Sequence, residues 1–185
     1  MQPELQKAIA DISAVTKDVK SCFAHLSLTQ LNWKPAADKW SVAQCLDHLI
    51  VSNKTYYPQL NKVVDGSYKN SLYQGIRPLS NFFGAWLVKE TGPVVGKPMK
   101  NPAAFSPSKS DLPISIVADF ERHQQEFIAL LRQLDKVDLE KTVISSPAAG
   151  FITYNLCHLL AILAGHQQRH FAQAKNVINH PNFGQ

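Results

Sequence analysis

Four long segments of this chain repeat apolar side chains at steps of three and four residues. In the first segment, residues 3–26, the stripe contains Leu5, Ile9, Ile12, Val15, Val19, Phe23 and Leu26. The other segments cover residues 41–64, 113–134 and 153–178. Because an α-helix turns once in 3.6 residues, this spacing puts the apolar side chains on one face. The pattern predicts an all-α four-helix bundle in a single domain, residues 1–185.

The ends of these segments carry helix-terminating signals. Ser41 with Gln44 three residues later matches the reciprocal capping pattern, so we expect the second helix to begin there and to end at Asp65-Gly66. Ser110 or Asp111 is placed to cap the third helix. Trp40 is expected to pack the start of the second helix against the core, and a role in lining the pocket is the alternative.

A long connection separates the second and third helices. Residues 66–110 contain one apolar and aromatic piece, residues 81–90, which we expect to form a short helix. The following stretch holds Pro93, Pro98, Pro102 and Pro107, which exclude regular structure there. Because long irregular segments in compact domains are often functional, we expect this one to lie over the mouth of the bundle.

Composition and charge exclude several classes of function. The 19 Lys and Arg outnumber the 14 Asp and Glu, but they are scattered, so we expect no nucleic-acid partner. No apolar stretch is long enough for a membrane span, and early charges argue against a secretory signal, which predicts a cytoplasmic protein without membrane contact. Cys22, Cys45 and Cys157 lie far apart in apolar stretches and are expected to be core residues.

Three histidines stand out as candidate metal ligands. His166 and His170 are four residues apart, so they project from one helix face about 40° apart. His48 lies among apolar residues of the second helix, where a buried imidazole needs a hydrogen-bond partner or a metal. Ordinary, satisfied core histidines are the alternative. Three nitrogen ligands would leave coordination positions open, as catalytic metal sites do.

Two motifs resemble those of a known family. KPAADKWSVAQCLDHL, residues 34–49, and GHQQRHFAQAKNVI, residues 165–178, are similar to the helix-two and closing motifs of the DinB-like superfamily. MKNPAAFSP, residues 99–107, resembles a loop of one branch, whose members are described as metal-dependent hydrolases and bacterial thiol S-transferases. The resemblance implies an up-down-down-up bundle and a metal held by His48, His166 and His170.

The ligand type and the resemblance together indicate the chemistry. Imidazoles without thiolates suit zinc, nickel or another divalent ion. Such an ion would activate either water or a low-molecular-weight thiol as co-substrate, for attack on a small-molecule substrate. The alternative is a non-catalytic, stress-associated bundle that binds metal or a small ligand. A homodimer is expected in either case.

The neighbours of these histidines supply no obvious general base. Asp47 adjoins His48 but points about 100° away around the helix. Arg169, next to His170, is expected to face solvent or a partner, or to meet an anionic group of the substrate. Tyr56 and Tyr57 are within reach of a pocket near His48.

The remaining histidines are expected to be structural or to lie on the surface. His158 is roughly 12 Å from His166 along the helix axis, too far to share a metal, and reads as a core or interface residue. His25, His123 and His180 have no partner at ligand spacing.

Overall fold

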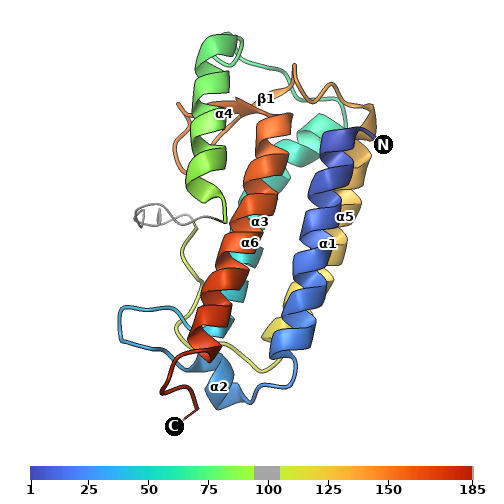
Figure 1. Ribbon diagram of the computed structural model, residues 1–185. Helices are drawn as coiled ribbons and strands as arrows, with labels where there is room; N and C mark the ends of the chain where they lie inside the picture. Colours follow the sequence, from blue (N-terminus) through green and yellow to red (C-terminus); the bar gives the residue numbers. More distant parts are fainter. Residues whose placement is uncertain (94–104, 185) are drawn as a thin grey trace.

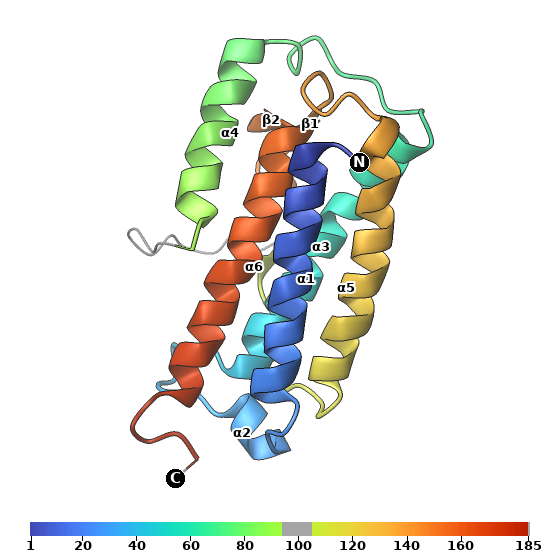
Figure 2. The same ribbon diagram turned by 45° about the vertical axis from the view of Figure 1, so that its right-hand side comes forward.

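The computed structural model describes residues 1–93 and 105–184, and four long helices run along its length (Figure 1). These helices are α1 (Pro3–Phe23), α3 (Val42–Val64), α5 (Ile116–Arg132) and α6 (Leu156–Ile178). The chain descends along α1 and α6 and ascends along α3 and α5 in both views (Figures 1 and 2). Both α1 and α3 pack against α5 and α6, so the four helices enclose one core. The predicted four-helix bundle is confirmed.

The apolar stripes form the bundle core as the spacing predicts. The stripe of α1 is buried along its whole length, from Leu5 to Phe23. Leu26 is also buried, although it lies between the end of α1 at Phe23 and the start of the short helix α2 (Leu28–Asn32). Side chains from all four long helices meet at both ends of the bundle. The stripes therefore orient every helix with one face inward.

Helix α5 begins later than its stripe suggests. Its N-cap is Ser115, which gives no side-chain cap, so the expectation of a cap at Ser110 or Asp111 is wrong. The residues after α5 tighten into the 3₁₀ helix η2 (Gln133–Lys136). The predicted stripe at residues 113–134 thus spans two kinds of helical turn, because apolar spacing alone does not separate a 3₁₀ turn from an α-helical one.

The connection between α3 and α5 is more ordered than the sequence suggests. Helix α4 (Arg77–Thr91) is 15 residues long, and it packs outside the bundle against α6 (Figure 2). Gly84 permits this packing, because a Cβ there would stand 2.4 Å from the His158 ring. The predicted short helix at residues 81–90 is confirmed, although it begins earlier, at Arg77, and ends at Thr91. The predicted irregular structure around Pro98 and Pro102 lies outside the described residues.

A small antiparallel hairpin precedes α6, so the all-α prediction needs correction. Strand β1 (Val143–Ser145) pairs with β2 (Thr153–Asn155), with Ile144 opposite Tyr154. The predicted start of the fourth helix at Thr153 is wrong, because these residues form the strand instead. Asn155 ends the strand and caps α6 by accepting a hydrogen bond from the His158 N–H, at 2.9 Å.

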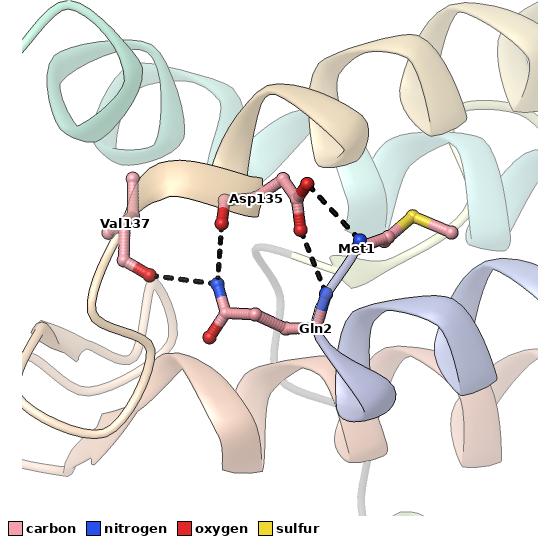
Figure 3. Close-up of polar contacts among 4 residues, drawn as sticks. All are labelled: Met1, Gln2, Asp135 and Val137. Atoms are coloured by element: carbon pink, nitrogen blue, oxygen red, sulfur yellow. Dashed lines mark hydrogen bonds and ion pairs between the residues drawn. The ribbon is translucent and has the colours of Figure 1, made fainter.

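The start of α1 is tied to η2 and to Val137, the residue after it, by a cluster of polar contacts (Figure 3). The Asp135 carboxylate accepts from the Gln2 backbone N–H at 2.8 Å and lies 3.5 Å from the Met1 amine. The Gln2 side chain donates to the carbonyls of Asp135 and Val137. An acidic group from a neighbouring element therefore takes the place of a side-chain cap at the positive end of α1.

The cysteines divide by burial. Cys45 is fully buried, and burial raises the pKa of its thiol, so its predicted core role is confirmed. Cys22 and Cys157 are only half-buried at the edge of the core, and all three are free thiols. Within residues 1–93 and 105–184, no helix combines the length and the apolar character needed to cross a membrane.

Candidate metal centre

His48, His166 and His170 meet between α3 and α6. One potential ligand atom from each lies within 4.8 Å of the other two. The Nε2 atoms of His48 and His166 are 3.0 Å apart, and the ring centroids of His48 and His170 are 4.3 Å apart. The structure thus brings together all three residues that the sequence singles out, although His48 lies more than a hundred positions from the others.

Local sequence features account for this convergence. The capping box of Ser41 and Gln44 is present, so α3 begins where predicted and His48 falls in its second turn. His48 is 1% exposed there. On α6, the four-residue spacing puts His166 and His170 on the face toward α3, with ring centroids 4.5 Å apart. The Ser41 cap sets where α3 begins and therefore where His48 lies along it. The helical period puts His166 and His170 on the same face of α6.

Two of the imidazoles are oriented by hydrogen bonds from their outer nitrogens. His48 Nδ1 donates to the Phe105 carbonyl oxygen, and His170 Nδ1 donates to Gln173 Oε1 at 2.9 Å. Carbonyl oxygens only accept, so each Nδ1 carries the proton and each Nε2 keeps a free lone pair. This is the arrangement by which proteins orient metal-binding histidines.

Burial keeps the three imidazoles neutral. It lowers the pKa of His48 to about 4, although the Phe105 hydrogen bond and the Asp47 charge oppose the shift. The pKa of His170 falls to about 3, first through burial and then through the charge of His48. Burial and the two neighbouring histidines hold the pKa of His166 well below its usual value. Lone pairs are therefore available for a cation at neutral pH.

Trp40 covers one side of the cluster. Its ring is stacked on His170, with centroids 5.6 Å apart, and lies 4.8 Å from His48. It also packs against the part of the bundle core that surrounds the start of α3, as expected from its place before this helix. The structure thus gives Trp40 both roles that the sequence left open, packing at the start of α3 and contact with the candidate site.

Residues 105–108 dock on α3 beside the cluster. Phe105 supplies the carbonyl that holds His48, and the Ser108 N–H donates to the Asp47 carboxylate at 2.5 Å. Consecutive residues of α3 thus hold one segment at two points. Asp47 points away from the cluster, as its position around the helix predicts, and its carboxylate is engaged with Ser108.

Other residues near the cluster have different roles from those expected. Arg169 donates to the Glu90 carbonyl at 2.5 Å, so it ties α6 to the end of α4 instead of facing solvent. Tyr56 is buried and hydrogen-bonded to Tyr154 at 2.9 Å. Tyr57 is stacked on His123, away from the three histidines.

The remaining histidines lie apart from the cluster. His158 packs under Gly84 of α4, in agreement with its predicted structural role. His25 is exposed, and His180 lies 5.4 Å from the Trp33 ring. His123 is 4% exposed and lies between α3 and α5, with Asn53 Nδ2 3.3 Å from its Nε2. Its environment was not apparent from the sequence, because its partners come from another helix.

The fold and the cluster define a helical bundle with a potential three-histidine metal centre. The model of the DinB superfamily matches residues 11–174, and the chain belongs to this superfamily. No protein of curated function matches the sequence.

A solved structure shares the fold. YfiT from Bacillus subtilis, described as "a probable metal-dependent hydrolase with an unusual four-helix bundle topology", aligns with a TM-score of 0.62. The alignment covers 97% of this chain and 89% of that chain, at 18% identity. At this identity the similarity establishes a common fold, and the chemistry has to be argued from the residues of this chain.

Proposed function

We propose that His48, His166 and His170 bind a divalent metal ion and that the protein is a metal-dependent enzyme acting on a small molecule. The convergence of three neutral imidazoles within 4.8 Å carries this proposal. Two nitrogens of a tetrahedral zinc site stand about 3.3 Å apart. The 3.0 Å between His48 Nε2 and His166 Nε2 is close to that value. Zinc and nickel both suit an all-imidazole site.

The nucleophile follows from what surrounds the cluster. A divalent ion bound there lowers the pKa of a coordinated water or thiol. The contacts described for the three histidines come from Trp40, Ser52, Phe105 and Gln173, none of which is a carboxylate. Water is a much weaker acid than a thiol, whose ordinary pKa is about 8.5, so a general base matters more for activating water. A thiol S-transferase therefore fits the described surroundings better than a hydrolase, which is the second candidate.

Metal content distinguishes this proposal from a fold without a metal site. After equal loading with zinc or nickel and removal of excess ion, the wild type should retain about one equivalent. His48→Ala and His166→Ala should retain little, and the exposed His25→Ala is the matched control. Equal metal in the wild type and both cluster variants would refute the proposal.

Thiol consumption distinguishes catalysis from binding alone. The metal-loaded protein is mixed with low-molecular-weight thiols and an alkyl halide, so that a sulfur–carbon bond forms as halide leaves and the thiol proton passes to solvent. Metal-dependent acceleration that His166→Ala abolishes supports the transferase. Metal binding without thiol consumption or ester hydrolysis would leave the alternative of a non-catalytic, ligand-binding bundle. The cytoplasmic location and the homodimer remain predictions, and sedimentation tests the latter.

A further inference from the structure

Helix α4 turns its largest side chains away from the bundle. Its buried residues are Ser80 and Gly84, and Gly84 packs on the His158 ring. The opposite face carries Phe82 and Trp86, which are 66% and 39% exposed. A helix on the surface of a globular protein normally shows the reverse pattern, with its large apolar residues directed inward. This helix, which stands outside the four-helix bundle, therefore presents its apolar face outward (Figure 2).

The exposed apolar surface continues beyond α4. The turn before this helix exposes Leu72, Tyr73 and Ile76, and Leu72 is 98% exposed. The Tyr73 hydroxyl donates to the Phe151 carbonyl at 2.7 Å, which holds the tip of the β1–β2 hairpin against this turn. Six of the nine large apolar residues that the described chain exposes thus belong to one region, the outer surface: Leu72, Tyr73, Ile76, Phe82, Trp86 and Phe151. Single exposed apolar side chains are common, but such a concentration marks an interaction surface.

The charges of this region are mostly positive. Residues 66–92 contain Lys69, Arg77 and Lys89 against the single carboxylate of Glu90, and the hairpin tip adds no charge. The three cations are exposed, whereas Glu90 is half-buried. The described part of the chain contains no ion pair for any of these four residues. The outer surface therefore combines aromatic side chains with an excess of positive charge.

The shape and charge of the outer surface restrict its partner. Two clefts, one between α3 and α5 and one between α1 and α6, are lined by none of its six residues. Peptides are usually bound in grooves or along open strand edges, whereas these side chains protrude. A second copy of this chain, docked through the same face, would bring like charges together and supply no exposed carboxylate. A bilayer with anionic headgroups offers an apolar layer for protruding side chains and negative charge for lysine and arginine.

We propose that the outer surface docks on a membrane that contains anionic lipids. Phe82, Trp86 and Leu72 enter the boundary between headgroups and acyl chains. Lys89, three residues after Trp86 and on the same face of α4, meets the headgroups. With 15 residues, α4 is shorter than the roughly 20 that a span needs, so the contact stays on the membrane surface. The sequence prediction of no membrane contact rested on the lack of a span, whereas a surface contact needs only one exposed apolar face.

The test is sedimentation of the full chain, without added metal, with vesicles of phosphatidylglycerol and phosphatidylcholine. The protein should bind these vesicles at least about tenfold more tightly than pure phosphatidylcholine, because each cation near an anionic surface contributes about fivefold. Phe82→Ser and Leu72→Ser should each weaken binding about tenfold, because each removes an apolar side chain from the boundary. The matched control is Leu28→Ser, a 51% exposed residue of α2 at the other end of the bundle (Figure 1).

A second pair of variants measures the electrostatic part. Lys89→Gln should weaken binding to the anionic vesicles about fivefold and leave binding to pure phosphatidylcholine unchanged. Lys17→Gln makes the same change of net charge at an exposed position of α1 and should bind like the wild type. The proposal does not depend on the metal centre, because Phe82→Ser should retain as much zinc as the wild type.

Three outcomes would overturn the proposal. The first is no binding to the anionic vesicles; if Phe82→Ser then dissociates a dimer of the wild type, the outer surface belongs to a second copy of this chain. The second is equal binding by Phe82→Ser, Leu72→Ser and the wild type, which would reduce the contact to general attraction of a cationic protein. The third is an equal loss in Leu28→Ser, which would place the contact elsewhere.

Discussion

Helix α3 carries buried histidine contacts on two flanks, and the two clusters differ in how their nitrogens are satisfied. Toward α6, three imidazoles converge and two of them point lone pairs at a common space. Toward α5, the single imidazole of His123 has Asn53 and Tyr57 at its two nitrogens. The three-histidine cluster therefore has nitrogen lone pairs available for a cation. Both nitrogens of His123, in contrast, already contact protein groups.

The comparison shows which observation is informative. Burial lowers the pKa of His48 and of His123 alike, to about 4 in each case. A perturbed pKa therefore does not separate the two clusters. Convergence of free lone pairs does, because only a cation or shared protons can stabilise several nitrogen lone pairs directed at one point.

The largest expected difference between the clusters is stabilisation by metal. At a free zinc concentration about a thousandfold above the dissociation constant, the wild type should gain about 4 kcal/mol in free energy of unfolding. His166→Ala should gain almost nothing, whereas His123→Ala should gain as much as the wild type. Urea unfolding with and without zinc measures these gains. A full gain in His166→Ala would break the distinction.

Acid should destabilise the metal-free protein through both clusters. A histidine whose folded pKa lies below its unfolded value of about 6.5 binds fewer protons when folded, so stability falls as pH drops below 6.5 and the loss is complete below the folded pKa. For His48, this loss amounts to about 3 kcal/mol by pH 4. Urea unfolding between pH 7 and pH 4 measures the slope, and a flat profile would contradict the buried, neutral state.

Removing His123 should cost stability without affecting metal. His123→Ala leaves a cavity between Tyr57 and Phe127 and removes the partner of the Asn53 amide, for an expected loss of about 2 kcal/mol. The exposed His25→Ala should change stability by less than about 0.5 kcal/mol. Loss of metal binding in a folded His123→Ala protein would mean that the two clusters are not independent.

The parts that the sequence predicted well depend on local signals. The apolar period predicted the four long helices, the Ser41 and Gln44 cap predicted the start of α3, and the four-residue spacing predicted the His166 and His170 pair. Each of these features is encoded within one turn or one stripe of a helix, where backbone geometry alone relates sequence to space.

The parts that the sequence did not predict depend on contacts between distant residues. The close packing of Gly84 against His158 depends on a contact between α4 and α6, and the sequence predicted helix at Thr153, where pairing with β1 makes a strand. Stacking of Trp40 on His170 depends on how α3 and α6 pack. Whether His48, His166 and His170 are metal ligands remains a prediction that metal analysis must test.

The smallest expected effect concerns the segment that joins the two flanks of α3. Asp47→Ala removes the acceptor of the Ser108 N–H, which loosens residues 105–108 and with them the carbonyl that orients His48. Because partners that orient a ligand histidine typically contribute tenfold or more to metal affinity, this indirect change should weaken zinc binding by up to about tenfold.

Asp47→Asn is the matched control, because its amide oxygen still accepts from Ser108 while the negative charge is lost. Competition with a chelator measures both affinities. If Asp47 acts by holding the segment, Asp47→Asn should bind zinc nearly as well as the wild type. If both variants lose affinity equally, the Asp47 charge acts on the cluster directly, and the mechanical link between the two flanks of α3 is wrong.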